Sequence, residues 1–204
     1  MRVEYLTEKQ IKAKVDDLLE WFYIRDYRLG VEDVSKDVDV VKLANEMGFI
    51  VQFEDLKSIF GENTLGTIFP QSKVILCDNS IEPVGKDKET KEHILRFTIA
   101  HEIGHYLLHR KYMEDSKSTL HHTKLNKREQ SRIEIQANMV AAMLLMPENL
   151  FSRRFKLLAL KHGLYQKKSI SVYAAVIKEL SAYFNASKKA VGYRIKELKD
   201  KIWR

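Results

Sequence analysis

The stretch from residue 92 to 110 constrains the fold most, because it is apolar on nearly every face of a helix. Its apolar residues are Ile94, Leu95, Phe97, Ile99, Ala100, Ile103, Leu107 and Leu108. A helix that is hydrophobic all round is buried. We therefore expect residues 92–110 to form a helix that packs against other elements on most of its surface. Two histidines, His101 and His105, lie in the middle of it.

Three short segments are typical of strands and predict the surface against which this helix packs. They cover residues 49–53, 64–69 and 74–77, and turn residues separate them. Helices are predicted behind a capping box at Thr7–Gln10, over residues 38–47 and over the largely apolar residues 133–146; Pro147 is expected to open another at its first position. These elements predict an α+β fold: a small sheet packed on the helix over residues 92–110 and on a second helix over residues 133–146.

The end of the chain has the pattern of a helix, a turn and a helix. Residues 170–184 and 188–198 show helical spacing, and Ser187 is placed to cap the second helix. We expect a first domain over residues 1–150 and a helical subdomain of helix-turn-helix character over 151–204. The second helix is basic, so it could bind phosphates. The interpretation we favour is that its basic face is only solvated, and that the helical pair packs on the first domain. Its basic residues are Lys188, Lys189, Arg194, Lys196, Lys199 and Lys201.

Composition limits the cellular setting more than it limits the activity. The chain has 204 residues, a formal net charge of +7 and a single cysteine, Cys77. A disulfide framework is therefore excluded, which favours a reducing compartment. No apolar run has the length of a membrane span, and the first residues lack the apolar core of a signal peptide. We expect a cytoplasmic protein without membrane contact.

The residues His101-Glu102-Ile103-Gly104-His105 form an H-E-x-x-H motif on the predicted helix. Histidines four residues apart lie on one helix face, so both imidazoles can reach one metal ion. Glu102 is then placed to act as a general base on water at that metal. Zinc accepts this ligand type, but a catalytic zinc needs a third protein ligand and an open fourth position.

Glu134 is the strongest candidate for the third ligand, because a carboxylate on an otherwise apolar helix is costly to bury unless it is paired or bound to metal. The alternative is an acid at a helix start that complements the helix dipole. Asn138, one turn further, could hydrogen-bond a ligand histidine. His109 lies roughly 12 Å of helix rise from His101, which is too far for a shared ion, so we expect a structural or supporting role for it. Cys77 is expected to be a small buried hydrophobe.

Residues 111–132 are polar and predict a long connection that could act as a lid. His121 and His122 lie in it. They could stabilise an oxyanion, or close the coordination sphere in a chain that binds zinc only structurally. The oxyanion donor is open at this point, and Tyr106 and Tyr112 are further candidates, although core packing suits Tyr106 better.

Two blocks of the sequence resemble the ImmA/IrrE metallopeptidase family. They are RFTIAHEIGHYLLH (residues 96–109) and EIQANMVAAMLLMP (residues 134–147), in the order and separation of that family's active-site and glutamate helices. The resemblance implies a zincin-like sheet packed on an active-site helix and a glutamate helix. It also implies zinc held by His101, His105 and Glu134, with Glu102 as base. Two departures are Gln136, where the family often has a second acid, and Met139, where it often has phenylalanine.

The resemblance also implies a substrate. Characterised members cleave helix-turn-helix transcriptional repressors, often of the Xre type, and so relieve repression of mobile-element or stress genes. We expect hydrolysis of a peptide bond in an extended chain bound along the free edge of the sheet, at strand 64–69 or 74–77. The alternative is a regulator that binds protein or DNA through its basic tail without proteolysis; direct nucleic-acid binding is the less favoured interpretation.

Overall fold

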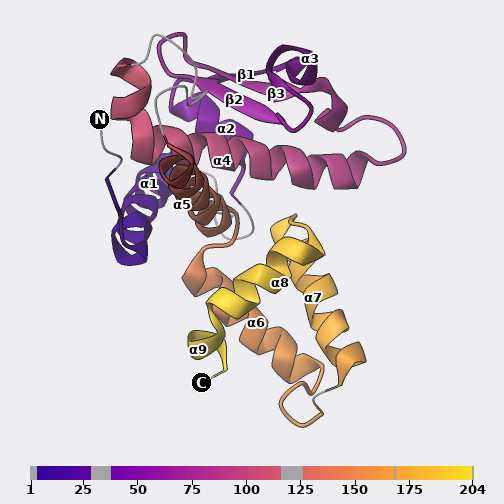
Figure 1. Ribbon diagram of the computed structural model, residues 1–204. Coiled ribbons are helices and arrows are strands. Elements are labelled where there is room, and N and C mark those ends of the chain that lie inside the picture. The colour runs from indigo at the N-terminus through magenta and orange to yellow at the C-terminus, as the bar shows by residue number, and fades with distance from the viewer. Residues whose placement is uncertain (1–3, 29–37, 116–125, 168, 204) are drawn as a thin grey trace.

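The computed structural model describes residues 4–28, 38–115, 126–167 and 169–203 (Figure 1). Over this part of the chain the helices are α1 (Glu8–Arg28), α2 (Val40–Glu46), α3 (Leu56–Phe60), α4 (Lys88–Asp115), α5 (Lys127–Leu145), α6 (Glu148–Lys161), α7 (Ile170–Phe184), α8 (Lys188–Glu197) and α9 (Lys199–Ile202). The strands are β1 (Ile50–Glu54), β2 (Gly66–Phe69) and β3 (Val74–Asp78), and a 3-10 turn, η1 (Asn79–Ile81), follows. The α+β class is confirmed.

The sheet has three strands in the order β1-β3-β2. Strand β1 runs parallel to β3, and β2 runs antiparallel to it. Strand β3 is therefore central, because it has a partner on both sides. The prediction that residues 74–77 could supply a free edge for a peptide is wrong, whereas β2 lies at an edge.

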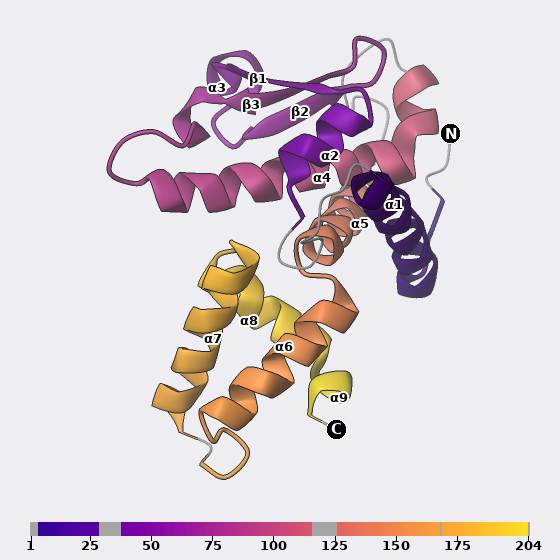
Figure 2. The same cartoon turned by 180° about the vertical axis from the view of Figure 1, so that it is seen from behind.

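Helix α4 lies along one face of the sheet, and α5 crosses α4 on the side away from it (Figures 1 and 2). Ile68 and Ile75 of the sheet and Ile99 and Ile103 of α4 have no exposed surface. The expectation that the apolar helix is buried is confirmed. Gly104 faces α5 so closely that a Cβ atom there would lie 3.0 Å from the carbonyl oxygen of Ala137.

Helices α4 and α5 are both longer than their apolar patterns predict. The predicted connection over 111–132 is wrong at both ends, since α4 continues to Asp115 and α5 begins at Lys127. Near the end of α4, Met113 is buried, and its carbonyl oxygen accepts a hydrogen bond from Gln71. At the start of α5, Asn126 and Glu129 form a capping box. Residues 116–125 lie outside the described part of the chain.

Helices α6 to α9 form a group on the far side of α4 from the sheet (Figures 1 and 2). The predicted turn at residues 185–187 is present, and Ser187 caps α8 by accepting a hydrogen bond from the amide of Ala190. Pro147 occupies the N-cap of α6 rather than its first helical position. The domain boundary at residue 150 stays a prediction.

Two buried arginines tie this group to the rest of the molecule. Arg96 of α4 donates to the backbone oxygens of Val38 and Asn185. Arg194 of α8 donates to the backbone oxygen of Met146, at the end of α5. These bonds satisfy carbonyl groups that would otherwise be costly to bury. None of the described helices combines the length and the apolar character that crossing a bilayer requires.

Candidate metal site

Helices α4 and α5 bring two histidines and one carboxylate to a single point. The Nε2 atoms of His101 and His105 are 2.9 Å apart. The carboxylate oxygens of Glu134 lie 3.2 Å from Nε2 of His101 and 3.4 Å from Nε2 of His105. One ligand atom from each residue falls within 4.8 Å of the others, so the group could hold a metal ion.

The neighbours of His101 and His105 direct their Nε2 lone pairs toward this point. Nδ1 of His101 lies 3.0 Å from Oδ1 of Asn138, which can only accept a hydrogen, so Nδ1 carries the proton. Nδ1 of His105 faces Nδ1 of His109 at 3.4 Å. With both protons on Nδ1, two imidazole lone pairs and a carboxylate converge, and such a set of acceptors is stabilised by a cation.

The spacing of the three residues fits zinc. Zinc bonds of about 2.0–2.1 Å at tetrahedral angles place ligand atoms about 3.3–3.4 Å from one another. The observed separations of 2.9, 3.2 and 3.4 Å are close to that value. Imidazole nitrogen with one carboxylate oxygen is also a donor set that zinc accepts readily. The residues present therefore fit the metal that the sequence predicts.

Glu102 lies beside the ligands, between α4 and strand β2. Its side chain is buried, and it accepts a hydrogen bond from the backbone amide of Ile68. Burial raises the pKa of Glu102 to about 7, and the negative charge of Glu134 adds to the rise. Gly66 lets β2 lie close to α4 here, because a Cβ atom there would lie 2.3 Å from Cγ2 of Thr98 and 3.3 Å from a Glu102 carboxylate oxygen. This contact of Glu102 with the sheet could not be predicted from the sequence.

Glu134 and Asn138 lie on one face of α5, as their spacing predicts. Helix α5 begins at Lys127, so Glu134 lies about two turns inside it. The alternative of an acid in the first turn therefore applies to Glu129 and not to Glu134. Asn138 hydrogen-bonds His101 as expected. The roles of these residues in metal binding and catalysis stay predictions.

A chain of buried polar groups continues behind His105. Nε2 of His109 lies 3.0 Å from Oε1 of Gln136, and the amide nitrogen of Gln136 donates to the backbone oxygen of Leu6 at 3.4 Å. Burial lowers the pKa of His109 to about 4, so this imidazole is neutral near pH 7 and its Nδ1 can accept a hydrogen from His105. The sequence predicts a supporting role for His109 but not its partner Gln136.

The other sequence candidates occupy different places. Cys77 is fully buried in β3, and burial raises the pKa of its thiol to about 12. The hydroxyl of Tyr106 accepts a hydrogen bond from Lys73, close to Phe49. The hydroxyl of Tyr112 accepts one from the backbone amide of Glu4. The loop candidates His121 and His122 lie outside the described residues.

The model of the family Peptidase_M78, described as the IrrE N-terminal-like domain, matches residues 91–196, slightly more than half of the chain. The chain belongs to the IrrE N-terminal-like family. The family resemblance that residues 96–109 and 134–147 predict is thereby confirmed.

The match to the IrrE N-terminal-like family includes α4, α5 and the helices up to α8. No curated protein matches the chain. One similar solved structure is a Mycobacterium tuberculosis transcriptional regulator, with 15% sequence identity and a TM-score of 0.48. The alignment covers 90% of this chain and 51% of that one, so the chain spans about half the length of the structure it matches.

Proposed function

We propose that this chain is a zinc-dependent endopeptidase. The observation that carries the proposal is the convergence of His101, His105 and Glu134 beside the buried carboxyl group of Glu102. Three protein ligands leave a fourth position of a tetrahedral site for water or substrate, which is the arrangement of catalytic rather than structural zinc. When bound, the zinc ion supplies Lewis acidity, which acidifies water and polarises a carbonyl oxygen.

Glu102 acts as the general base in this proposal. Its carboxylate takes a proton from the attacking water, whose oxygen bonds to the scissile carbonyl carbon, and later gives that proton to the leaving amine as the C–N bond breaks. A pKa of about 7 suits both steps, because a group that accepts and returns a proton works best near the ambient pH. A nearby cation lowers this pKa and favours the accepting form.

Strand β2 is the element best placed to hold the substrate. It is an edge strand, it packs on α4, and its residue Ile68 hydrogen-bonds Glu102. An extended peptide can add to such an edge through main-chain hydrogen bonds. The scissile bond would then lie between β2 and the three ligands. His101 and Asn138 would lie on the side of the peptide opposite to β2.

For the substrate we propose a helix-turn-helix transcriptional repressor, cut at one place, in the cytoplasm. This assignment rests on the family resemblance of residues 96–109 and 134–147. The alternative, DNA binding through the tail, has less support. Of the basic residues of this tail, Arg194 is buried and donates to the backbone oxygen of Met146, so it is not available to a phosphate.

A cleavage assay with Xre-type repressors from the source genome tests the proposal. We expect the zinc-loaded wild type to cut one of them at a single bond, and a chelator or Glu102→Gln to abolish the cut. Glu148→Gln, on α6, is a matched control and should cleave normally. If no repressor is cut while a mixed peptide library is, the enzyme class stands and the repressor assignment falls. If neither is cut, the peptidase proposal is wrong.

A further inference from the structure

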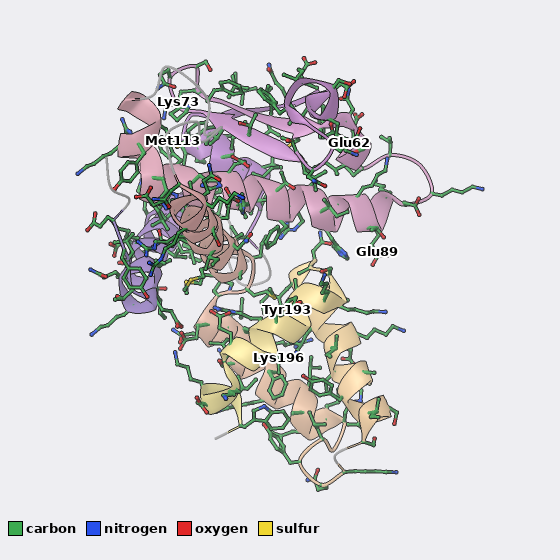
Figure 3. The ribbon with its side chains drawn as sticks, in the orientation of Figure 1. Glu62, Lys73, Glu89, Met113, Tyr193 and Lys196 are labelled. Carbon is green, nitrogen blue, oxygen red and sulfur yellow. The ribbon has the colours of Figure 1, made fainter. Side chains whose placement is uncertain are left out.

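A cavity of about 830 Å³ lies next to the metal ligands, between α4, α5 and α8. Figure 3 shows Glu89 on α4 and Tyr193 on α8, two of its lining residues, on facing elements. We propose that this cavity binds a large apolar side chain of the peptide substrate, close to the scissile bond. This inference rests on the proposed peptidase function and adds the substrate class that the site selects.

The cavity lies beside the metal site, and residues adjoining the ligands line it. Asn138 lines it and also hydrogen-bonds Nδ1 of His101. Phe97 lines it one helical turn before His101, with 6.4 Å between the two ring centroids. A peptide substrate that passes the three ligands therefore reaches the cavity within a few residues.

The cavity also meets the edge strand on which the substrate would lie. Leu65, which directly precedes β2, and Thr98, which packs beneath Gly66, both belong to its lining. A peptide paired with β2 would thus enter the cavity where the strand begins. Strand pairing supplies affinity in such complexes, and pockets for individual side chains supply specificity.

The chemistry of the walls favours an apolar group. Ile94 and Phe97 of α4, Ala142 and Met146 of α5 and Ala190 of α8 contribute apolar surface. The charged lining residues carry both signs, so they do not select one charge: they are Glu89, Lys188, Lys189, Arg194 and Glu197. Pockets of about 300–1,000 Å³ with mostly apolar walls and a few polar groups are typical ligand sites. This volume accommodates a leucine, methionine or phenylalanine side chain together with its neighbours.

The far wall belongs to the helical tail and is held in place by defined contacts. Arg194 of α8 hydrogen-bonds the backbone oxygen of Met146, and Asn185, just before α8, donates to Glu92 of α4. The tail therefore contributes to the substrate site in this proposal. That contribution gives α6 to α8 a function other than DNA binding.

Selection from a peptide library tests the proposal without relying on catalysis. The probe is a randomised N-acetylated octapeptide library, bound to immobilised, zinc-loaded Glu102→Gln protein, eluted and sequenced. In that background, Ala142→Trp fills the cavity from α5 and Ala190→Trp fills it from α8. Ala174→Trp, at an exposed position on α7, is the matched control. Circular dichroism and zinc content show whether each variant keeps its fold and its metal.

We expect Leu, Ile, Met or Phe to be enriched about tenfold or more at one position with the parent protein and with Ala174→Trp. The enrichment should disappear with either cavity-filling variant that keeps its fold. Absence of any apolar enrichment, or equal enrichment with both filled variants, would overturn the inference. If wild type cleaves no peptide while the enrichment pattern holds, the peptidase proposal fails and the apolar site stands. If wild type cleaves peptides without this preference, the peptidase proposal stands and the inference about the apolar cavity fails.

Discussion

At the scale of single residues, the metal site depends on the hydrogen-bond partners of its histidines. Asn138 fixes the proton of His101 on Nδ1, and His109 faces Nδ1 of His105. Each partner leaves the Nε2 lone pair of its ligand free to point at the ion. Such partners typically change metal affinity 10–100-fold when they are removed.

Replacing His109 with leucine should weaken zinc binding by about 10–100-fold without removing a ligand. The reason is that Nδ1 of His105 loses an acceptor and Oε1 of Gln136 loses a donor. Competition with a chromophoric chelator measures the affinity. His162→Leu is the control, because His162 pairs with Glu179 on α7, away from the site. Unchanged affinity in His109→Leu would show that this chain of groups does not support His105.

Cys77 should be inert toward thiol reagents in the folded protein. With a pKa of about 12, only about one thiol in 10⁴ is ionised at pH 8, and the side chain has no exposed surface. Because the raised pKa keeps the thiol protonated, reactivity should rise with pH and should rise sharply on unfolding. Ellman's reagent measures both rates. Rapid modification of native protein at pH 8 would contradict the buried placement.

At the scale of elements, the site exists because α4 and α5 approach closely at Gly104. A Cβ atom at that position would lie 3.0 Å from both the carbonyl oxygen of Ala137 and the Cβ of Val140. The same stretch of α5 carries Glu134 and Asn138. The distance between the two helices therefore determines whether the carboxylate reaches the histidines.

Gly104→Ala should destabilise the protein by about 1–3 kcal/mol and weaken zinc binding, because the added methyl group pushes α5 away from α4. Gly192→Ala is the matched control: Gly192 is also helical, and nothing lies within 4 Å of the added Cβ. That change should stabilise the protein by about 0.5–1 kcal/mol. Urea unfolding gives both values. A stabilising effect at both positions would mean that the helices can separate without cost.

Elements with a local signal could be predicted from the sequence, and elements that depend on distant contacts could not. The capping box at Thr7 and Gln10, the apolar face of α4 and the Ser187 cap are all present as expected. The order β1-β3-β2 arises from pairing between distant segments. The short helix α3, capped by Asp55, gave too brief a pattern to recognise.

The same distinction between local signals and distant contacts applies to the candidate site. His101 and His105 are one turn apart on a single helix, so their proximity follows from the spacing alone. Glu134 lies on another helix, and the family resemblance indicated that it lies close to them. The cost of burying a carboxylate does not support this placement, because the Glu134 side chain is 43% exposed. The pairing of His109 with Gln136 and the contact of Glu102 with β2 depend on tertiary packing. The capping box of Asn126 and Glu129 was not predicted, although its spacing of three residues can be seen in the sequence.

At the scale of the whole molecule, Arg96 connects three parts of the chain. It donates to the backbone oxygens of Val38, before α2, and of Asn185, between α7 and α8. It also lies on α4, one turn before the metal ligands. The position of the tail is therefore coupled to the helix that carries His101.

Arg96→Met should lower the free energy of unfolding by about 2 kcal/mol, because carbonyl oxygens in a buried setting lose their donor while the apolar stem is kept. Arg128→Met, at an exposed position on α5, is the control and should change stability by less than about 0.5 kcal/mol. Thermal and urea unfolding measure both variants. Equal effects would show that Arg96 does not hold the tail.

The central claim is that His101, His105 and Glu134 together hold one zinc ion, with Glu102 outside the coordination sphere. Elemental analysis of purified wild type, Glu134→Ala and Glu102→Gln tests it most directly. We predict one zinc per chain in wild type and in Glu102→Gln, and loss of zinc in Glu134→Ala. Full zinc retention in Glu134→Ala would place the third ligand elsewhere, and a wild type that binds no zinc would contradict the proposed metal site.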